Sequence, residues 1–303
     1  MGGGAWTANS WAAYSAQNVV GRSSAQIYKQ RTVDSRFDPH GIKIRESRDS
    51  DEHPDSTAII IGLDVTGSMD DILEQVAKKL NVLVREILDR KPVTDPQIMF
   101  NAIGDAVVDR HPFQVTQFES DIRIAEQLTD LYFERGGGGN GFESYPLAWY
   151  FAANHTDIDC LNKRGKKGFL FTMGDDCYPK VLTKEQISRI FGDTVSENID
   201  TAALLNQVNR KYEVFHLVLD REGGWHSGNS SRIEKWRDLM GERVIKVPDY
   251  TKVPEIIVSI LETMGGKDVD DVAASWDGST SLVVKTALSG LRSKTAQNDV
   301  VTF

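Results

Sequence analysis

One carboxylate and two hydroxyls stand at alternate positions directly after an apolar stretch of the sequence. Residues 58–63 read Ala-Ile-Ile-Ile-Gly-Leu, and Asp64, Thr66 and Ser68 follow. In an extended or turning backbone, side chains two positions apart point to the same side. Carboxylate and hydroxyl oxygens are the ligands that Mg²⁺ takes, usually with several waters completing its shell. The spacing therefore predicts a divalent-cation site.

Helix capping is the simpler explanation for part of this pattern. The hydroxyl of Thr66 or Ser68 can cap a following helix, and Asp70 and Asp71 favour the helix dipole. Capping does not explain Asp64, because a lone carboxylate at the end of an apolar strand is costly unless it is paired or bound to a cation. We therefore favour the cation site over the cap.

Two further loops carry oxygen-bearing side chains. Residues 136–141 read Gly-Gly-Gly-Gly-Asn-Gly, so Asn140 and Glu143 supply oxygens near a predicted helix start. Asp175 and Asp176 follow another apolar stretch. Ligands of open α/β sheets bind where the carboxyl ends of strands meet, so we expect the three loops to converge. Taken singly, the glycine-rich loop also fits a hinge, and the acidic pair also fits a turn with a helix cap.

Strand and helix patterns alternate over the middle of the sequence. Strands are predicted at 58–63, 98–103, 113–118, 168–173, 214–219 and 244–247, and helices at 72–87, 121–133, 142–153, 183–191, 199–211, 231–240 and 254–264. This alternation predicts a doubly wound α/β fold. We expect a mainly parallel, six-stranded sheet with one antiparallel edge strand and helices on both faces.

The two ends of the chain differ from this middle part. Residues 1–56 form a polar N-terminal extension, whose aromatic side chains are expected to pack back on the domain; 57–266 form the α/β domain, and 267–303 a weakly periodic C-terminal tail. The extension ends in a mixed-charge run, which is typical of a solvated connector. The alternative is that the segment covers the metal loop and that one of its acidic side chains acts as a built-in ligand of the metal. The acids of this run are Glu46, Asp49, Asp51, Glu52 and Asp55.

The composition of the chain disfavours several classes of partner and of binding site. The 303 residues include 35 Lys and Arg against 44 Asp and Glu, a formal charge of −9. This balance disfavours nucleic acid or an anionic membrane as the main partner, although a local basic patch remains compatible with it. Cys160 and Cys177 fit neither a disulfide framework nor a zinc motif. With no targeting signal and no apolar run of membrane-spanning length, a cytoplasmic location is expected.

The run Asp64-Val-Thr66-Gly-Ser68-Met resembles the DxTGS signature of the von Willebrand factor type A (vWA) domain, in the form typical of intracellular prokaryotic and alpha-kinase-related members. The resemblance covers about 57–265 in element order and is specific mainly at this motif. It implies a Rossmann-like vWA fold with a metal-ion-dependent adhesion site (MIDAS).

The resemblance also implies a ligand set. By this resemblance, Mg²⁺ (or Mn²⁺ or Ca²⁺) would bind to five residues: Asp64, Thr66, Ser68, Asn140 and Asp175. Asp105, Glu143 and Asp176 would form a possible outer shell. The third motif departs from the family, because Met173 stands where Asp is usual and the acid comes two residues later.

The function implied by the resemblance is adhesion rather than catalysis. A partner protein's Asp or Glu completes the coordination of the metal, so no enzymatic activity is expected. Many intracellular prokaryotic relatives act as adaptors of MoxR-type AAA+ ATPases, which makes such an ATPase the leading partner class.

An enzyme is the alternative. The same motif resembles the phospho-aspartate motif of haloacid dehalogenase-like phosphotransferases, with Asp64 as nucleophile and Asp175 or Asp176 holding Mg²⁺. A lysine among Lys163, Lys166 and Lys167 would then neutralise the phosphoryl group. Association with RNA, as in Ro-type proteins, is disfavoured by the net charge.

Overall fold

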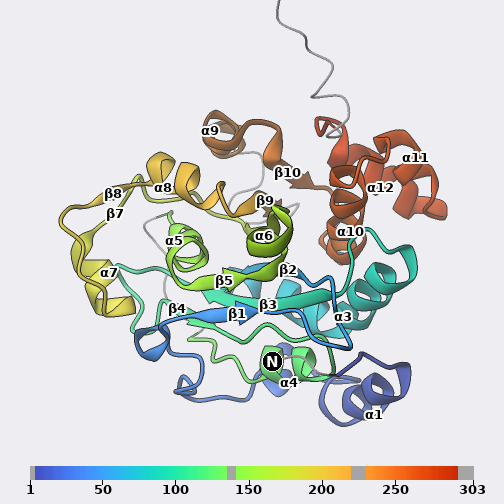
Figure 1. Cartoon of the computed structure of the whole chain (residues 1–303), viewed down its shortest axis with the longest axis horizontal. Helices are drawn as coiled ribbons and strands as arrows, with labels where there is room; N and C mark the ends of the chain where they lie inside the picture. The colour runs from blue at the N-terminus through green and yellow to red at the C-terminus, as the bar shows by residue number, and fades with distance from the viewer. Residues whose placement is uncertain (1–3, 135–140, 220–229, 293–303) are drawn as a thin grey trace, which may run out of the picture.

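A six-stranded sheet forms the centre of the computed structural model, which describes residues 4–134, 141–219 and 230–292 (Figure 1). The strand order is β10-β9-β6-β2-β3-β4, and every pair is parallel except β3 with β4. The strands are β2 (Thr57–Asp64), β3 (Pro96–Ile103), β4 (Phe113–Val115), β6 (Gly168–Gly174), β9 (Tyr212–Leu219) and β10 (Val244–Val247). The expected α/β sheet with one antiparallel edge strand is confirmed.

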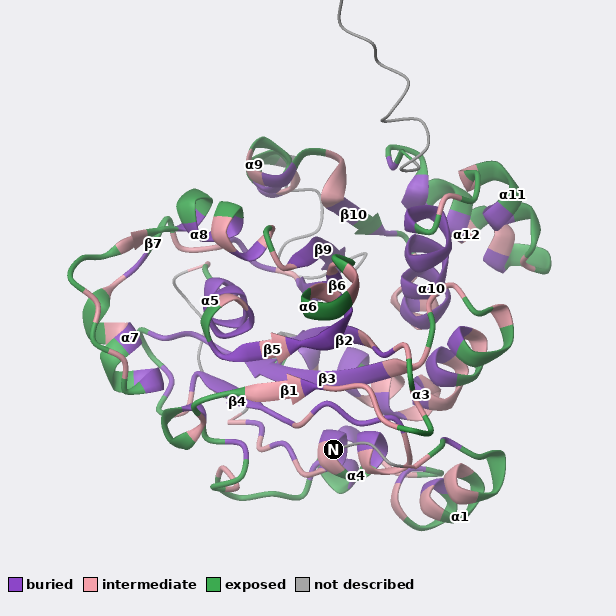
Figure 2. Cartoon of the chain, in the orientation of Figure 1, coloured by how far each residue is buried: buried purple, intermediate pink, exposed green. Residues whose placement is uncertain are grey.

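The central strand β2 is apolar throughout because both of its faces are covered. Ile59 and Ile61 pack into one core cluster, whereas Ile60 packs into the cluster on the opposite face. A strand buried on both faces needs apolar residues at successive positions, as the sequence pattern indicated. Figure 2 shows the central strands in the buried colour.

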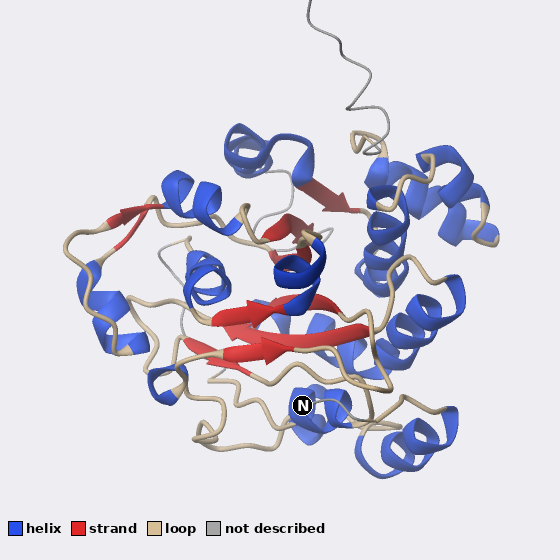
Figure 3. Cartoon of the chain, in the orientation of Figure 1, coloured by secondary structure: helices blue, strands red, loops and turns tan. Residues whose placement is uncertain are grey.

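Helices cover both faces of the sheet (Figure 3). One core cluster takes residues from α3 (Asp70–Arg90), α4 (Arg123–Thr129) and α10 (Val253–Met264). The opposite cluster takes residues from α5 (Pro146–Asn154), α6 (Asp159–Arg164), α7 (Lys184–Phe191), α8 (Thr201–Val208) and α9 (Ser230–Met240). The fold is therefore doubly wound. Helix α5 begins later than predicted, at Pro146, whose ring fits the first helical turn.

The polar N-terminal segment is more structured than its sequence suggested. Its elements are α1 (Ala8–Asn18), α2 (Ser24–Ile27), η1 (Pro39–Gly41) and β1 (Arg45–Ser47), and β1 pairs with β5 (Thr156–Ile158). A capping box between Thr7 and Ser10 starts α1. Trp6 is only 7% exposed and donates a hydrogen bond to Asn81, so the expected packing of its aromatic ring against the domain is confirmed.

Ion pairs fix the acidic run of this segment far from Asp64. Arg164 contacts the carboxylates of Asp49 and Asp55 at 2.8 and 2.6 Å. Arg164 ends the helix that precedes β6, so these contacts lie at the amino ends of the strands. Asp64 lies at the opposite, carboxyl end of β2. The described contacts give Asp49 and Asp55 a structural role here, rather than the role of a cover for the metal loop.

The C-terminal segment also folds more than predicted. Two helices, α11 (Val269–Ala274) and α12 (Gly278–Leu288), pack against α10. The remaining short elements are η2 (Gly67–Met69), β7 (Val181–Leu182), β8 (Ile199–Asp200), η3 (Gly241–Arg243) and η4 (Tyr250–Lys252).

Candidate functional site

Asp64 lies fully buried at the carboxyl end of β2, where three donors orient its carboxylate. Its Oδ1 accepts hydrogen bonds from the backbone N–H and the hydroxyl of Thr66, at 3.0 and 2.6 Å. Its Oδ2 accepts a hydrogen bond from the hydroxyl of Tyr145 at 2.9 Å. The carboxylate is therefore held in one orientation from two sides.

Burial and a neighbouring acid make this carboxylate costly to ionise. Burial first, and the negative charge of Asp175 second, raise the pKa of Asp64 to about 7, although the hydrogen bonds from Thr66 and Tyr145 act in the opposite direction. A nearby cation would favour the ionised form.

Glu143 is a second buried acid at the same place. It is 1% exposed, and neither of its carboxylate oxygens accepts a hydrogen bond within the described residues. Burial, followed by the charges of Asp64 and Asp105, raises the pKa of Glu143 to about 10. Buried polar atoms without a protein partner are rare in native proteins, and many of those that occur contact an ion or an ordered water.

The end of β6 can lie close to Asp64 because residue 174 is a glycine. A Cβ at Gly174 would lie 2.0 Å from the Tyr145 hydroxyl oxygen and 2.6 Å from Oδ2 of Asp64. Any larger residue would force the two strand ends apart. The next residue, Asp175, is half-buried and acts electrostatically on Asp64. Asp176 instead lies 3.8 Å from the guanidinium of Arg232 in α9.

Asp105 shapes the neighbouring loop after β3. Its Oδ1 accepts a hydrogen bond from the N–H of Val107 at 2.8 Å, and its own N–H donates to Asp109 at 2.7 Å. The hydroxyl of Ser144 accepts from the N–H of Ala106 at 2.9 Å, which ties this loop to the segment that carries Glu143. Asp105 therefore acts on the site through its charge and through the loop.

Of the residues from the three loops, Thr66 contacts Asp64 directly, whereas Glu143 and Asp175 are related to Asp64 through the electrostatic effects described above. The whole of Asn140 and the side chain of Ser68 lie outside what the structure describes. Within the described ranges, no group of three or more His, Cys, Asp and Glu side chains is placed to hold a metal ion. Asp64, Glu143 and Asp175 therefore do not form such a group as they stand in this structure.

Tyr145 was not predicted from the sequence as a site residue. Its hydroxyl donates to Asp64 and lies 3.4 Å from the N–H of Asp176, so it bridges the first and third loops. Its ring packs edge-on against His216 and Trp236. The only available signal was its position two residues after Glu143, and an aromatic residue at the start of an apolar helix is more typical of a core position.

The lysines of the phosphotransfer alternative lie at the wrong edge of the sheet. Lys163, Lys166 and Lys167 precede β6, whereas Asp64 follows the parallel strand β2. Met173, the pairing partner of Leu63, lies six positions after Lys167, which corresponds to about 20 Å along the strand. Lys163 is also paired with Asp159 at 2.7 Å. None of these three lysines is placed to neutralise a phosphoryl group on Asp64.

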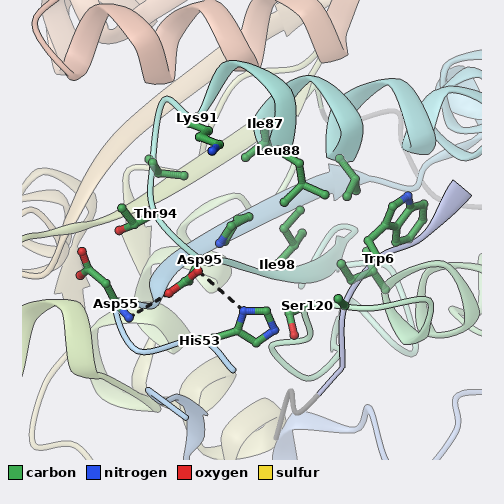
Figure 4. A pocket seen from close by; sticks show the side chains of 15 residues that line it. Trp6, His53, Asp55, Ile87, Leu88, Lys91, Thr94, Asp95, Ile98 and Ser120 are labelled. Carbon is green, nitrogen blue, oxygen red and sulfur yellow. Dashed lines mark hydrogen bonds and ion pairs between the residues drawn. The ribbon is translucent and has the colours of Figure 1, made fainter. Parts of the chain in front are cut away.

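A largely apolar cavity of about 310 Å³ lies at the amino edge of the sheet (Figure 4). Trp6 and Ile98 line it, and Asp95 contacts two of the other lining residues. Asp95 accepts from the N–H of Asp55 at 2.9 Å and lies 3.7 Å from Nδ1 of His53. None of its lining residues belongs to the candidate site.

Comparisons with known proteins give only distant structural similarity. Neither the known family profiles nor the characterised protein sequences match the chain. The chain is similar to the pilus adhesin SpaC from Lactobacillus rhamnosus GG in its open conformation, with a TM-score of 0.48 and 9% identity, covering 74% of this chain and 31% of that one. It is also similar to proximal thread matrix protein 1 from the mussel byssus, with a TM-score of 0.41 and 8% identity, covering 69% of this chain and 47% of that one.

The chain thus spans less than half the length of these neighbours, and similarity at this level carries no functional argument. No helix within the described ranges combines the length and the apolar character needed to cross a membrane.

Proposed function

We propose that the carboxyl edge of the sheet binds a divalent cation, Mg²⁺ or Mn²⁺, and that this cation recruits an acidic side chain of a protein partner. The observation that carries the proposal is Glu143, a buried carboxylate without a hydrogen-bond partner in the described residues, beside the buried carboxylate of Asp64. Two acids in low dielectric repel each other, and a cation between them removes that cost.

The ligand set follows from the residues present. Asp64, Thr66, Glu143 and Asp175 supply oxygens of the kind that Mg²⁺ accepts. Ser68 and Asn140 remain proposed ligands from the sequence motif. In this proposal Glu143 is a direct ligand rather than an outer-shell group, because its carboxylate is buried and accepts no hydrogen bond from the described residues.

Exposed apolar side chains beside the site favour a protein partner over a small molecule. Val107 and Val108 are 72% and 52% exposed, in the loop shaped by Asp105, and Phe142, next to Glu143, is 39% exposed. Arg189 fixes the same loop by donating a hydrogen bond to the carbonyl of Ala106. A contiguous exposed apolar patch is typical of protein interaction sites, and in this proposal these side chains form part of one.

The vWA assignment is part of this proposal. It is supported by the DxTGS motif at the carboxyl end of the central strand β2, with η2 and the long helix α3 directly after it. The partner class implied by the resemblance, a MoxR-type ATPase, stays a prediction.

Titration calorimetry with Mg²⁺ and Mn²⁺ tests the metal site. We expect saturable binding to the wild type and at least about tenfold weaker binding to Glu143→Gln, a loss of one charged ligand. Glu255→Gln, a buried glutamate on α10 that is 7% exposed, serves as the matched control and should bind like the wild type. Equal affinity of both variants, or no binding by the wild type, would show the proposal to be wrong.

A peptide array tests the recruitment step. Labelled protein is applied with Mg²⁺ or with EDTA, and peptides that contain Asp or Glu should be retained only with Mg²⁺. Asp64→Asn protein should lose this retention. Retention that is indifferent to EDTA, or that needs no acidic residue, contradicts recruitment through the metal.

A further inference from the structure

A basic cavity lies on another side of the loop that follows β3. It has a volume of about 240 Å³ and is formed by η1, this loop and the last turn of α7. Four basic side chains line it: His40, Arg110, His111 and Arg189. In a chain with a formal charge of −9, this concentration of basic side chains is unusual.

Backbone contacts hold these residues in place. Asp38 accepts a hydrogen bond from the N–H of His40 at 3.0 Å and so starts η1. The carboxylate of Glu134 accepts from the N–H groups of Arg110 and His111, at 3.3 and 3.1 Å. Arg189 donates to the carbonyl of Ala106. Contacts within the protein therefore hold the lining residues in position without a ligand.

Among the residues that the structure describes, no carboxylate forms an ion pair with either arginine of the cavity. Within the described ranges, the guanidinium of Arg110 forms no ion pair, and that of Arg189 contacts a carbonyl rather than a carboxylate. Asp38 is the one carboxylate among the lining residues. Two permanent positive charges thus line the cavity with one carboxylate, and the nearby carboxylate of Glu134 is bound to the backbone N–H groups of Arg110 and His111. The two imidazoles add N–H donors.

We propose that this cavity binds the phosphate group of a small molecule or a free phosphate ion. The planar guanidinium fork matches the oxygens of phosphate, and arginine is the residue that favours such recognition. The volume lies below the range of about 300–1,000 Å³ typical of sites for drug-sized ligands, so it suits a compact anionic group. A group with two charges and three or four oxygens can use both arginines and the imidazoles together.

The proposal does not depend on the proposed metal site. The cavity shares none of its lining residues with Asp64, Thr66, Glu143 or Asp175. Binding can therefore be measured with EDTA present, which also removes metal–phosphate complexes. Failure of one proposal leaves the other standing.

Calorimetry at constant ionic strength, with inorganic phosphate and with glycerol 3-phosphate as probes, tests the site. We expect saturable binding to the wild type and binding at least about tenfold weaker to Arg110→Gln. Arg110 is exposed and its guanidinium makes no described contact, so this variant should fold normally. Arg210→Gln, an exposed arginine after α8, is the matched control and should bind like the wild type. Arg189→Gln provides a second test, with circular dichroism confirming its fold.

The two probes distinguish the sources of the phosphate group. Tighter binding of glycerol 3-phosphate identifies a phosphate ester as the ligand, and equal or tighter binding of inorganic phosphate identifies the free ion; both support the site. Affinity that Arg110→Gln and Arg210→Gln leave equally unchanged, or the lack of saturable binding of either probe at millimolar concentration, overturns the proposal.

Discussion

The substitution Asp64→Asn separates a cation-binding carboxylate from one that only shapes a turn. In the metal-free protein, the pKa of Asp64 is raised from 3.8 to about 7 by burial and by Asp175. At about 1.4 kcal/mol per pKa unit, ionising this group costs about 4 kcal/mol of folding stability. Asparagine has nearly the same shape but stays neutral, so it avoids this cost.

The sign of the pH dependence follows from the direction of the shift. Because the folded-state pKa lies above the unfolded value, the folded protein binds the proton more tightly. The contribution of Asp64 to metal-free stability is therefore lost as pH rises from about 4 to about 7, and then stays constant. The variant keeps the oxygen that accepts from Thr66, but it weakens the contact with Tyr145 by about 1 kcal/mol. We expect Asp64→Asn to be about 2–3 kcal/mol more stable than the wild type at pH 8 in EDTA, and of similar stability near pH 4.

Urea unfolding at both pH values, in EDTA and in Mg²⁺, measures these differences. Mg²⁺ should stabilise the wild type at pH 8 and leave the variant unchanged. Asp89→Asn, at a side chain that is 65% exposed on α3, controls for the loss of a surface charge. An Asp64→Asn protein that is less stable than the wild type in EDTA at pH 8 would assign Asp64 a structural role. One that Mg²⁺ still stabilises would refute the ligand assignment.

Two further substitutions test the packing around the site and the attachment of the N-terminal segment. Gly174→Ala should lower the free energy of unfolding by about 3 kcal/mol, because its Cβ would lie 2.6 Å from Oδ2 of Asp64. The control Gly290→Ala should have little effect, because no atom lies within 4 Å of the added Cβ. Equal urea midpoints for the two glycine variants would contradict the close approach. Arg164→Gln should cost about 2–3 kcal/mol and speed cleavage of the N-terminal segment in limited proteolysis, since it breaks contacts with Asp49 and Asp55, whereas Arg85→Gln should not. Unchanged cleavage would show that other contacts hold the segment.

The sheet was predictable because its signal is local. Successive apolar residues such as Ile59, Ile60 and Ile61 reflect a strand covered on both faces, and each is buried as expected. Helices α1 and α12 were not predicted, because neither shows clear apolar periodicity in its own sequence. They are stabilised by docking: α1 lies beside the buried Trp6, and α12 packs on α10.

The candidate site was predictable only in its first loop. The spacing of Asp64 and Thr66 is visible in the sequence, and the two side chains contact each other as neighbours in a turn. The importance of Glu143 depends on its burial, which is set by how Tyr145 and Gly174 bring distant strands together. Such long-range packing leaves no mark on the local sequence pattern.

The pairing of the N-terminal segment with residues far along the chain has a consequence for synthesis. Contacts of Arg48 with Asp157 and of Asp49 with Arg164 join residues that are 109 and 115 positions apart. The segment leaves the ribosome before these partners and waits ~5–20 s for them at ~5–20 residues per second. During that time it must stay unbound without aggregating. Its composition, rich in Gly, Ser and charged residues and poor in apolar runs, suits a segment that is made early and docks late.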